Sequence, residues 1–132
     1  MANRDNPHGL APLMRSFSGG QPAVRLYGKD ASHGAIYQND AVEMDDDGYI
    51  KTNGTPGSMY LLGVAMNYGA TTSATDHLVI VDPSATFEAQ DDADTDGFAL
   101  VDRGLSVNLV LNAGSTTTGI SGHELDESTA HA

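Results

Sequence analysis

The chain has 132 residues and a formal net charge of −12, because 18 acidic residues face only six Lys and Arg. A chain of this length is expected to form a single domain. Phosphate backbones and anionic membranes are held mainly by Lys and Arg, so the charge balance argues against nucleic acid and membrane as partners. The chain has no cysteine, which excludes disulfide bonds and thiolate metal sites.

Residues 1–22 are predicted to form an extended N-terminal arm. They contain three prolines and three glycines and follow neither the period of a strand nor that of a helix. The opening MANRDNPHGLAP also lacks the apolar run of a secretory signal. Isolated apolar residues along the arm are candidate anchors on a neighbouring molecule, or else they pack on the chain's own sheet: Leu10, Leu13, Met14 and Phe17.

Residues 23–111 are predicted to form a β core. Short runs of apolar and β-branched residues between turn clusters indicate strands at 23–27, 35–38, 41–44, 49–52, 59–66, 77–82, 85–90 and 106–111. No segment sustains a helical period, although residues 98–104 suit one short helical turn closed by Gly104. The fold class is therefore mainly β, a small single-domain β-barrel or sandwich.

Three local features refine this core. Asn53-Gly54 is a hairpin signal after the fourth run, and Pro56 and Gly57 beyond it predict a connection longer than two residues. Gly63, inside the most apolar run, indicates a bulge or the close approach of another backbone. The runs at 77–82 and 85–90, separated by Pro83, predict a hairpin.

Residues 112–132 are Gly/Ser/Thr-rich, and we expect a loop-like C-terminal segment. Hydroxyl side chains in such a segment bond to nearby backbone. Candidate contacts with a partner molecule are the three consecutive threonines, Thr116, Thr117 and Thr118. The alternative is an ordered loop that covers one end of the β core.

Two acidic clusters raise the question of a metal. Asp92, Asp94 and Asp96 before a glycine match the start of a calcium loop, but the twelfth position, which needs a bidentate glutamate, is Arg103. The alternative is an acidic turn, so we predict no cofactor and keep calcium as a weak possibility. The run 45–47 is expected to be a solvated hairpin tip, because adjacent strand residues point to opposite faces.

Catalytic chemistry has little support in the sequence. The five histidines have neither HxH nor HxxxH spacing, and His77 is expected at the rim of a strand. A Ser-His-Asp group could form only through the fold, and the chain lacks a GxSxG elbow. We therefore predict no enzyme and no catalytic residue. A small carbohydrate-active enzyme is the alternative: 18 acids allow many carboxylate pairs, but the chain has no Trp to form a sugar-binding platform.

Six motifs follow one another along nearly the whole chain: MANRDNPHGLAP, AIYQNDAVEMDDDGYI, LLGVAMNY, VIVDPSATFEAQ, ALVDRG and GSTTTGISGHELDES. In this order they resemble the capsid decoration (cement, or head-stabilising) proteins of tailed bacteriophages. The likeness departs at Leu10, where the family usually has an aromatic residue, and after the closing motif, where its chains usually continue into another β segment.

The resemblance implies a non-catalytic β-rich subunit that assembles as a homotrimer. Its partner would be the major capsid protein, on the outer surface of a virion, after synthesis in the host cytoplasm. The two end segments would then act as clamps on neighbouring subunits, and removing residues 1–22 would abolish shell binding while sparing the fold. A calcium-dependent β-rich interaction module is the alternative that the sequence itself leaves open.

Overall fold

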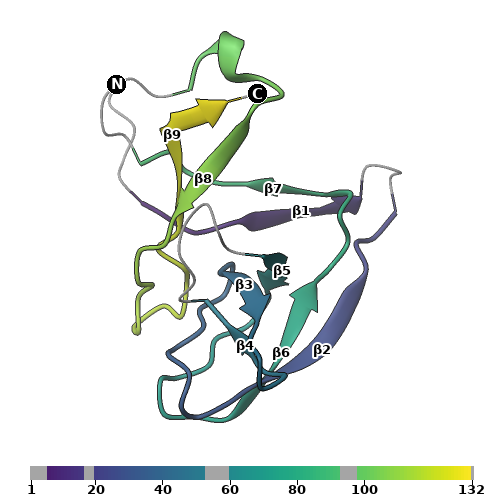
Figure 1. The fold of residues 1–132 in the computed structure, drawn as a ribbon, viewed down its shortest axis with the longest axis vertical. Coiled ribbons are helices and arrows are strands. Elements are labelled where there is room, and N and C mark those ends of the chain that lie inside the picture. Colours follow the sequence, from purple (N-terminus) through teal and green to yellow (C-terminus); the bar gives the residue numbers. More distant parts are fainter. Residues whose placement is uncertain (1–5, 17–19, 53–59, 93–97, 132) are drawn as a thin grey trace.

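The computed structural model describes residues 6–16, 20–52, 60–92 and 98–131, and within them the chain is mainly β, as predicted (Figure 1). The strands and the one 3₁₀ turn (η1) are β1 Ala11–Ser16, β2 Val24–Lys29, β3 Ala41–Met44, β4 Ile50–Lys51, β5 Leu61–Ala65, β6 Thr75–Ile80, β7 Ala85–Glu88, η1 Leu100–Asp102, β8 Ser106–Val110 and β9 Glu124–His131. The predicted helical turn is confirmed as η1, and Gly104 follows it with a φ of 81°.

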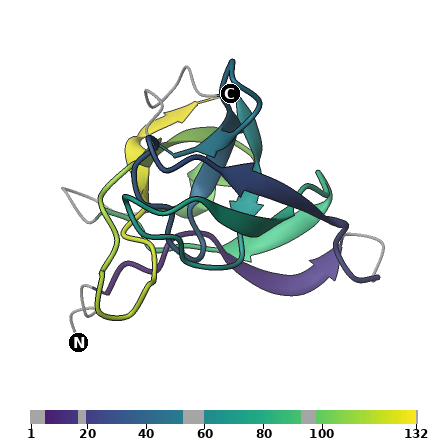
Figure 2. The ribbon, with the colours of Figure 1, turned by 90° about the horizontal axis from the view of Figure 1, so that it is seen from below.

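The strands of the described residues form three antiparallel sheets. The largest has the order β2-β6-β5-β3-β4, and β1-β7 and β8-β9 are two-stranded. Figure 1 shows the large sheet in the lower half, β1 and β7 across the middle, and β8 and β9 above them. Seen from below, in Figure 2, β1 lies to one side of the large sheet. The described strands close no barrel.

The core lies in the large sheet and the loops beside it. Its fully buried members come from the loop before β3 and from four strands: Ile36, Val42, Ile50, Ala65 and Val79. Successive side chains of a strand point to opposite sides, so every second residue of a strand faces the core and the residue between them faces away from it. On β6, for example, His77 and Val79 are buried while Leu78 between them is exposed.

Gly63 confirms the predicted close approach of another backbone. A Cβ atom at this position would lie 2.1 Å from the carbonyl oxygen of Ile80 and 2.8 Å from Val79 Cγ1. The β3–β5 register also shifts between Val42 and Glu43, opposite this glycine. Only glycine therefore fits between β3 and β6 here.

The predicted hairpin of residues 77–82 with 85–90 is wrong. Both edges of β6 are already occupied, by β2 on one side and β5 on the other. Pro83, which has no N–H to donate, prevents the strand from continuing. The chain then leaves the large sheet, and β7 pairs with β1 instead.

The predicted strand at 35–38 is reduced to two isolated bridges, Ile36 with Gly69 and Gln38 with Ile120. Asn39 next to them has a φ of 75°, a left-handed conformation that ends extended pairing. The Asn53-Gly54 turn lies outside the described residues.

The described part of residues 1–22 is extended, and it is attached to the chain itself, which is the alternative that the sequence left open. β1 pairs with β7, with Ala11 opposite Glu88. The backbone N–H of Leu10 donates to the carbonyl of Asn39 (2.9 Å), and the Asn39 amide donates to the carbonyl of His8 (2.9 Å). Removing residues 1–22 is therefore expected to destabilise the subunit rather than to spare it.

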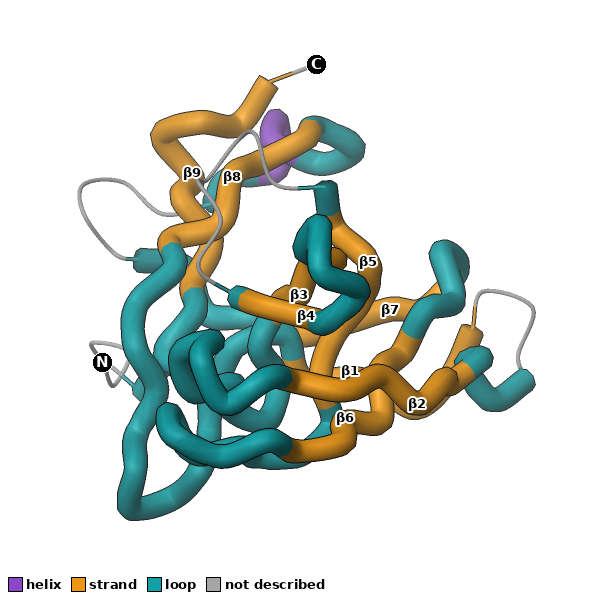
Figure 3. The backbone as a smooth tube through the Cα atoms, turned by 60° about the horizontal axis from the view of Figure 1, so that its bottom comes forward, coloured by secondary structure: helices purple, strands orange, loops and turns teal. Residues whose placement is uncertain are grey.

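The C-terminal segment is not loop-like throughout. β9 pairs with β8, with Leu125 opposite Leu109, and this apolar cross-strand pair explains why a polar-rich sequence adopts a strand. The part before β9 packs on the chain itself: Gln38 donates to the carbonyl of Gly119 (2.8 Å), and Ser121 donates to that of Gln38 (2.9 Å). Figure 3 shows this long loop in teal, beside the orange strands.

Lys29, the last residue of β2, is buried and holds two loops together. Its Nζ donates to the carbonyls of Asp30 (3.0 Å), His33 (3.2 Å) and Ser73 (2.7 Å). Burial lowers the pKa of the ammonium group, and the charge of Asp30 opposes that shift. The three carbonyls would lose this charged donor together if the side chain became apolar.

Replacing Lys29 with methionine is therefore expected to lower the free energy of unfolding by about 2 kcal/mol, since charge-assisted bonds to buried carbonyls are lost. Urea unfolding followed by circular dichroism measures it. Arg25→Met removes the same charge from an exposed position of the same strand and is expected to leave the midpoint nearly unchanged. Equal stability of the two variants would contradict this role for Lys29.

Candidate functional site

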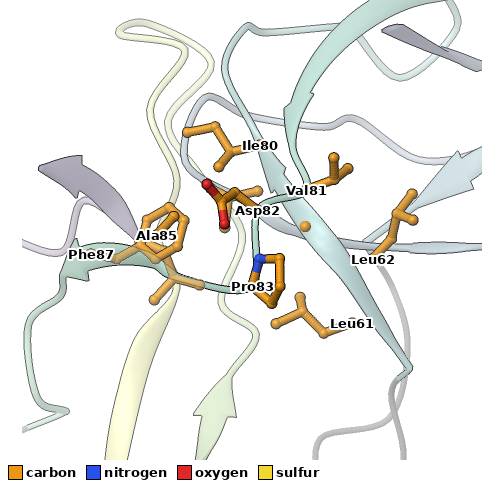
Figure 4. A pocket seen from close by; sticks show the side chains of 11 residues that line it. Leu61, Leu62, Ile80, Val81, Asp82, Pro83, Ala85 and Phe87 are labelled. Carbon is orange, nitrogen blue, oxygen red and sulfur yellow. The ribbon is translucent and has the colours of Figure 1, made fainter. Parts of the chain in front are cut away.

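An apolar groove lies between β7 and the large sheet, with a volume of about 510 Å³. Figure 4 shows Phe87 and Ala85 on one side and Leu61 and Leu62 on the other. The full lining is Leu10, Leu61, Leu62, Gly63, Val64, Ile80, Val81, Asp82, Pro83, Ala85 and Phe87. A groove of this composition suits apolar side chains of a ligand or partner.

The one acidic group in the groove is already engaged. The carboxylate of Asp82 accepts bonds from the Ser84 hydroxyl (2.7 Å), the Ser84 N–H (2.9 Å) and the Ala23 N–H (3.4 Å). The Ser84 bonds lower the pKa of Asp82. This carboxylate is therefore an ionised structural group, and it offers no free acid for catalysis.

A second apolar area lies on the outer face of the large sheet. Val24, Leu26 and Leu78 are 41%, 63% and 47% exposed, and Leu26 lies directly opposite Leu78. We call these three residues the β2–β6 patch. Another exposed apolar pair, Leu100 and Val101, lies on η1. Exposed apolar residues that adjoin one another are typical of surfaces that contact other molecules.

The predicted anchor residues of the N-terminal segment are distributed differently. Leu10 lines the groove of its own chain, whereas Leu13 on β1 is more than half exposed. Met14 lies on β1, but its side chain and Phe17 fall outside the described part of the structure. Leu13 is thus the predicted anchor that the structure shows to be accessible.

The three threonines lie in a turn that the chain fixes internally. The Ser115 hydroxyl accepts bonds from the N–H groups of Thr117 and Thr118 (3.3 Å each), and Gly119 N–H donates to the Ser115 carbonyl (2.7 Å). Thr116, Thr117 and Thr118 remain exposed. Their contact with a partner stays a prediction, on a turn that is ordered without one.

Beneath this turn the loop rests on two tyrosines. A Cβ at Gly114 would lie 2.4 Å from the Tyr37 ring, and one at Gly119 would lie 3.2 Å from Tyr68 Cβ. The two rings lie 5.3 Å apart. The glycines therefore let the loop backbone lie against the aromatic pair, which favours the alternative of an ordered loop that packs on the chain itself.

The fold brings together a serine, a histidine and an aspartate that sequence spacing could not connect. Ser121, His123 and Asp40 are all at least 98% buried. His123 Nε2 lies 3.5 Å from Asp40 Oδ1 and 3.4 Å from Thr52 Oγ1, while its Nδ1 accepts the Ala41 N–H (3.3 Å). The ring is therefore neutral, with its proton on Nε2.

This buried group, which we call the Asp40–His123 pair, is not arranged as a nucleophile with its base. The Ser121 hydroxyl accepts the backbone N–H of His123 (3.0 Å), and the imidazole faces Asp40 and Thr52 instead. Burial raises the pKa of Asp40 to about 6, against bonds from Ser121 and Tyr37 that lower it. Burial also lowers the pKa of His123 to about 4.

The expectation that His77 lies at a rim is wrong, because its side chain is fully buried. Its Nδ1 lies 2.9 Å from the carbonyl of Asn67. Burial lowers the pKa of the imidazole, against the Asn67 bond that raises it. Its neutral ring fills the space beside Gly69, where a Cβ would come within 2.6 Å of Nε2.

The proposed calcium loop falls mostly outside the described residues. Asp94 and Asp96 are in that part, and Asp92 donates its backbone N–H to the carbonyl of Leu125 (3.0 Å), which places it beside β9. Calcium at Asp92, Asp94 and Asp96 therefore stays an untested alternative to the predicted acidic turn.

A different acidic cluster does converge. His33 Nε2 lies 3.2 Å from Asp45 Oδ2 and 3.2 Å from Asp47 Oδ2. The predicted hairpin tip at 45–47 is confirmed as a turn between β3 and β4, closed by a bond from Gly48 N–H to the Asp45 carbonyl (3.1 Å), and within it Asp45 and Asp47, two residues apart, both face His33. His33 comes from the loop after β2, 12 residues earlier, so no local spacing could have revealed the group.

Comparison with known proteins gave no match to a family model, a curated protein or a solved structure. In the part of the chain that the structure describes, no helix is long and apolar enough to cross a membrane. Fold and surface define a small, mainly β, acidic domain with apolar areas open to other molecules.

Proposed function

We propose that this chain is a capsid decoration protein of a tailed bacteriophage. It binds the outer face of the assembled shell as a homotrimer and stabilises the shell by clamping neighbouring major capsid proteins. The observation that carries the proposal is the ordered series of motifs from MANRDNPHGLAP to GSTTTGISGHELDES. Each motif is short, and their order along nearly the whole chain gives the resemblance its weight.

Three features of the described residues support a binding role. The β2–β6 patch and the η1 pair offer apolar area at separate places on the surface, as a subunit that contacts both its own copies and a shell requires. The groove is apolar, and the carboxylate in its lining, that of Asp82, is already hydrogen-bonded to Ser84. The net charge of −12 suits the outer face of a shell better than an interior that holds DNA.

The mechanism is mass action. A ligand that binds the assembled shell and not its free subunits stabilises the shell by its binding free energy. Symmetric repetition multiplies a modest contact, because a trimer that engages several sites gains effective concentration at the second and third. The domain needs no catalytic group for this role.

The test uses the full-length chain and shells of the encoding phage prepared without it. We expect a solution mass three times that of the chain, by light scattering, and saturable co-sedimentation with the shells. The double variant Leu26→Ser/Leu78→Ser changes the β2–β6 patch. It is expected to lower at least tenfold either the apparent affinity for shells or the affinity of the subunits for one another in the trimer. Its circular dichroism should match the wild type, because both side chains are exposed.

The control changes a polar side chain on β6 that lies outside the β2–β6 patch. Thr75→Ser keeps the strand and its polar surface, and is expected to bind as the wild type does. A monomer that does not sediment with shells would refute the proposed function.

A further inference from the structure

We propose that His33, Asp45 and Asp47 form a binding site for a divalent first-row transition-metal cation of the Zn²⁺ type. The three residues come from two loops at one end of the large sheet: His33 follows β2, and the two aspartates lie in the turn between β3 and β4. Their nearest donor atoms all lie within 4.8 Å of one another. This site is independent of the proposed capsid function.

The distances fit the edges of a tetrahedron around a small cation. Zinc–nitrogen and zinc–oxygen bonds of about 2.0–2.1 Å place neighbouring ligand atoms roughly 3.3 Å apart. His33 Nε2 lies 3.2 Å from each of the Asp45 and Asp47 Oδ2 atoms. Two of the three edges therefore have the required length before any cation is added.

Each ligand is held in place through its other polar atom. His33 Nδ1 lies 3.3 Å from the Ile50 carbonyl, Asp45 Oδ1 accepts Lys51 Nζ (2.9 Å), and Asp47 Oδ1 accepts the Tyr49 N–H (3.0 Å). These partners lie outside the triangle of donor atoms. Metal ligands are typically oriented by such outer bonds, which fix the ring tautomer and the direction of each carboxylate.

The three donor atoms surround a position that calls for positive charge. Since a carbonyl can only accept, the Nδ1 that faces the Ile50 carbonyl carries a proton, which leaves Nε2 as the ring nitrogen available to a metal. Nε2 lies close to one oxygen of each carboxylate, and a metal ion among the three donor atoms would bond all of them at once.

The surroundings carry charges of both signs. Lys51 is the cation that faces the cluster; it bonds the outer oxygen of Asp45 and lies 4.0 Å from Glu43. Asp46, in the same turn, adds negative charge without joining the three donors. The local balance of four carboxylates against one ammonium favours a cation.

The donor set selects the class of metal. Imidazole nitrogen suits Zn²⁺ and its neighbours in the first transition row, while Ca²⁺ and Mg²⁺ prefer sites made of oxygen atoms alone. Three protein ligands leave a fourth position. The Asp47 side chain is 42% exposed and that of His33 13%, so this position opens towards solvent on the Asp47 side. Water, or a group from a neighbouring molecule, can occupy it.

A bound cation would join the loop after β2 to the β3–β4 turn. Both are already anchored near their ends, the loop by the bond from Lys29 to the His33 carbonyl and the turn by the Asp45–Tyr49 backbone bond. The expected consequence is stabilisation of the folded chain in proportion to cation concentration, because the unfolded chain does not assemble the three donors.

The experiment titrates ZnCl₂ into the full-length chain after treatment with a chelator and dialysis, with isothermal calorimetry as the readout. We expect one Zn²⁺ per chain. His33→Gln and Asp47→Asn are each expected to weaken binding at least tenfold. Asp47→Asn keeps the oxygen that accepts the Tyr49 N–H. Asp46→Asn is the matched control: it removes the same charge from the same turn, and its affinity should stay within about twofold of the wild type.

A second measurement needs no variant. In the wild type, nitrogen-15 spectra of the histidine rings should show the Nε2 resonance of His33 shifting on addition of Zn²⁺. The melting temperature should rise by at least about 5 °C when the free Zn²⁺ concentration is a hundred times the dissociation constant. The inference would be overturned by an absence of stoichiometric binding, by equal weakening in Asp46→Asn and Asp47→Asn, by a shift at another histidine instead, or by tighter binding of Ca²⁺ than of Zn²⁺.

Discussion

Replacing Gly63 with alanine is expected to lower the free energy of unfolding by at least about 3 kcal/mol, the upper part of the range for overpacked cores. The added methyl carbon would lie 2.1 Å from the carbonyl oxygen of Ile80 and 3.0 Å from its carbonyl carbon. These are backbone atoms of β6, the central partner of both β2 and β5. They cannot turn away as a flexible side chain would, so the strands must separate.

Chemical unfolding in urea, followed by circular dichroism, measures this effect. Gly34→Ala is the matched control, because a Cβ at Gly34 has no atom within 4 Å. That variant is expected to remain within about 0.5 kcal/mol of the wild type, as most surface substitutions do. If Gly63→Ala unfolded at the same urea concentration as Gly34→Ala, the close contact between β5 and β6 would be refuted.

The Asp40–His123 pair is expected to hide two opposite pH dependences in the wild type. Burial raises the pKa of Asp40 from 3.8 to about 6, so its contribution to stability is fully present below pH 3.8 and is lost as the pH rises through 6. Burial lowers the pKa of His123 from 6.5 to about 4, so its contribution is present above pH 6.5 and is lost as the pH falls through 4.

Each shift of two or more pKa units corresponds to about 3 kcal/mol over its full range. Between pH 4 and 6 the folded pair holds one proton, on Asp40, and the unfolded pair also holds one, on His123. Because the two states bind equal numbers of protons, the pair contributes almost no slope to the stability of the wild type in this interval.

Single substitutions should separate the two effects. Relative to the wild type, lowering the pH from 7 to 5 is expected to raise the free energy of unfolding of His123→Asn by about 1 to 2 kcal/mol. The same change should lower that of Asp40→Asn by a similar amount. Urea unfolding at the two pH values, for the three proteins side by side, provides the measurement. Parallel pH profiles for all three would contradict the assigned pKa directions.

The sequence predicted which segments would be strands better than how they pair. Residues 41–44 and 77–80 carry the alternation or apolar density that burial in a sheet requires, and both lie in strands. Pairing is decided elsewhere. In the sequence, β7 resembles the second strand of a hairpin with β6. However, β6 has no free edge for it, because one edge is occupied by β2, a strand about 50 residues earlier in the chain.

The surface features were predicted less well, for a related reason. The cluster of His33, Asp45 and Asp47 depends on a turn that brings alternate residues to one side and on a loop held by Lys29. Neither the turn nor the loop has a sequence motif of fixed spacing by which it could be recognised. Composition correctly indicated a loop around Gly114 and Gly119, but it did not show that those glycines allow packing on the chain's own tyrosines.

Asn39 gives the fold a particular order of events during synthesis. Its backbone meets Leu10 and Ala65, its neighbour Gln38 meets Ser121, and Gly9 packs against both Asn39 and Ser121. Residues from the beginning, middle and end of the chain thus meet at one point, which cannot close until residue 121 has left the ribosome. Until then the early segments lack partners from the later part of the chain, so this junction forms late in folding, and such long-range closure is slow and leaves strand edges unpaired in the meantime.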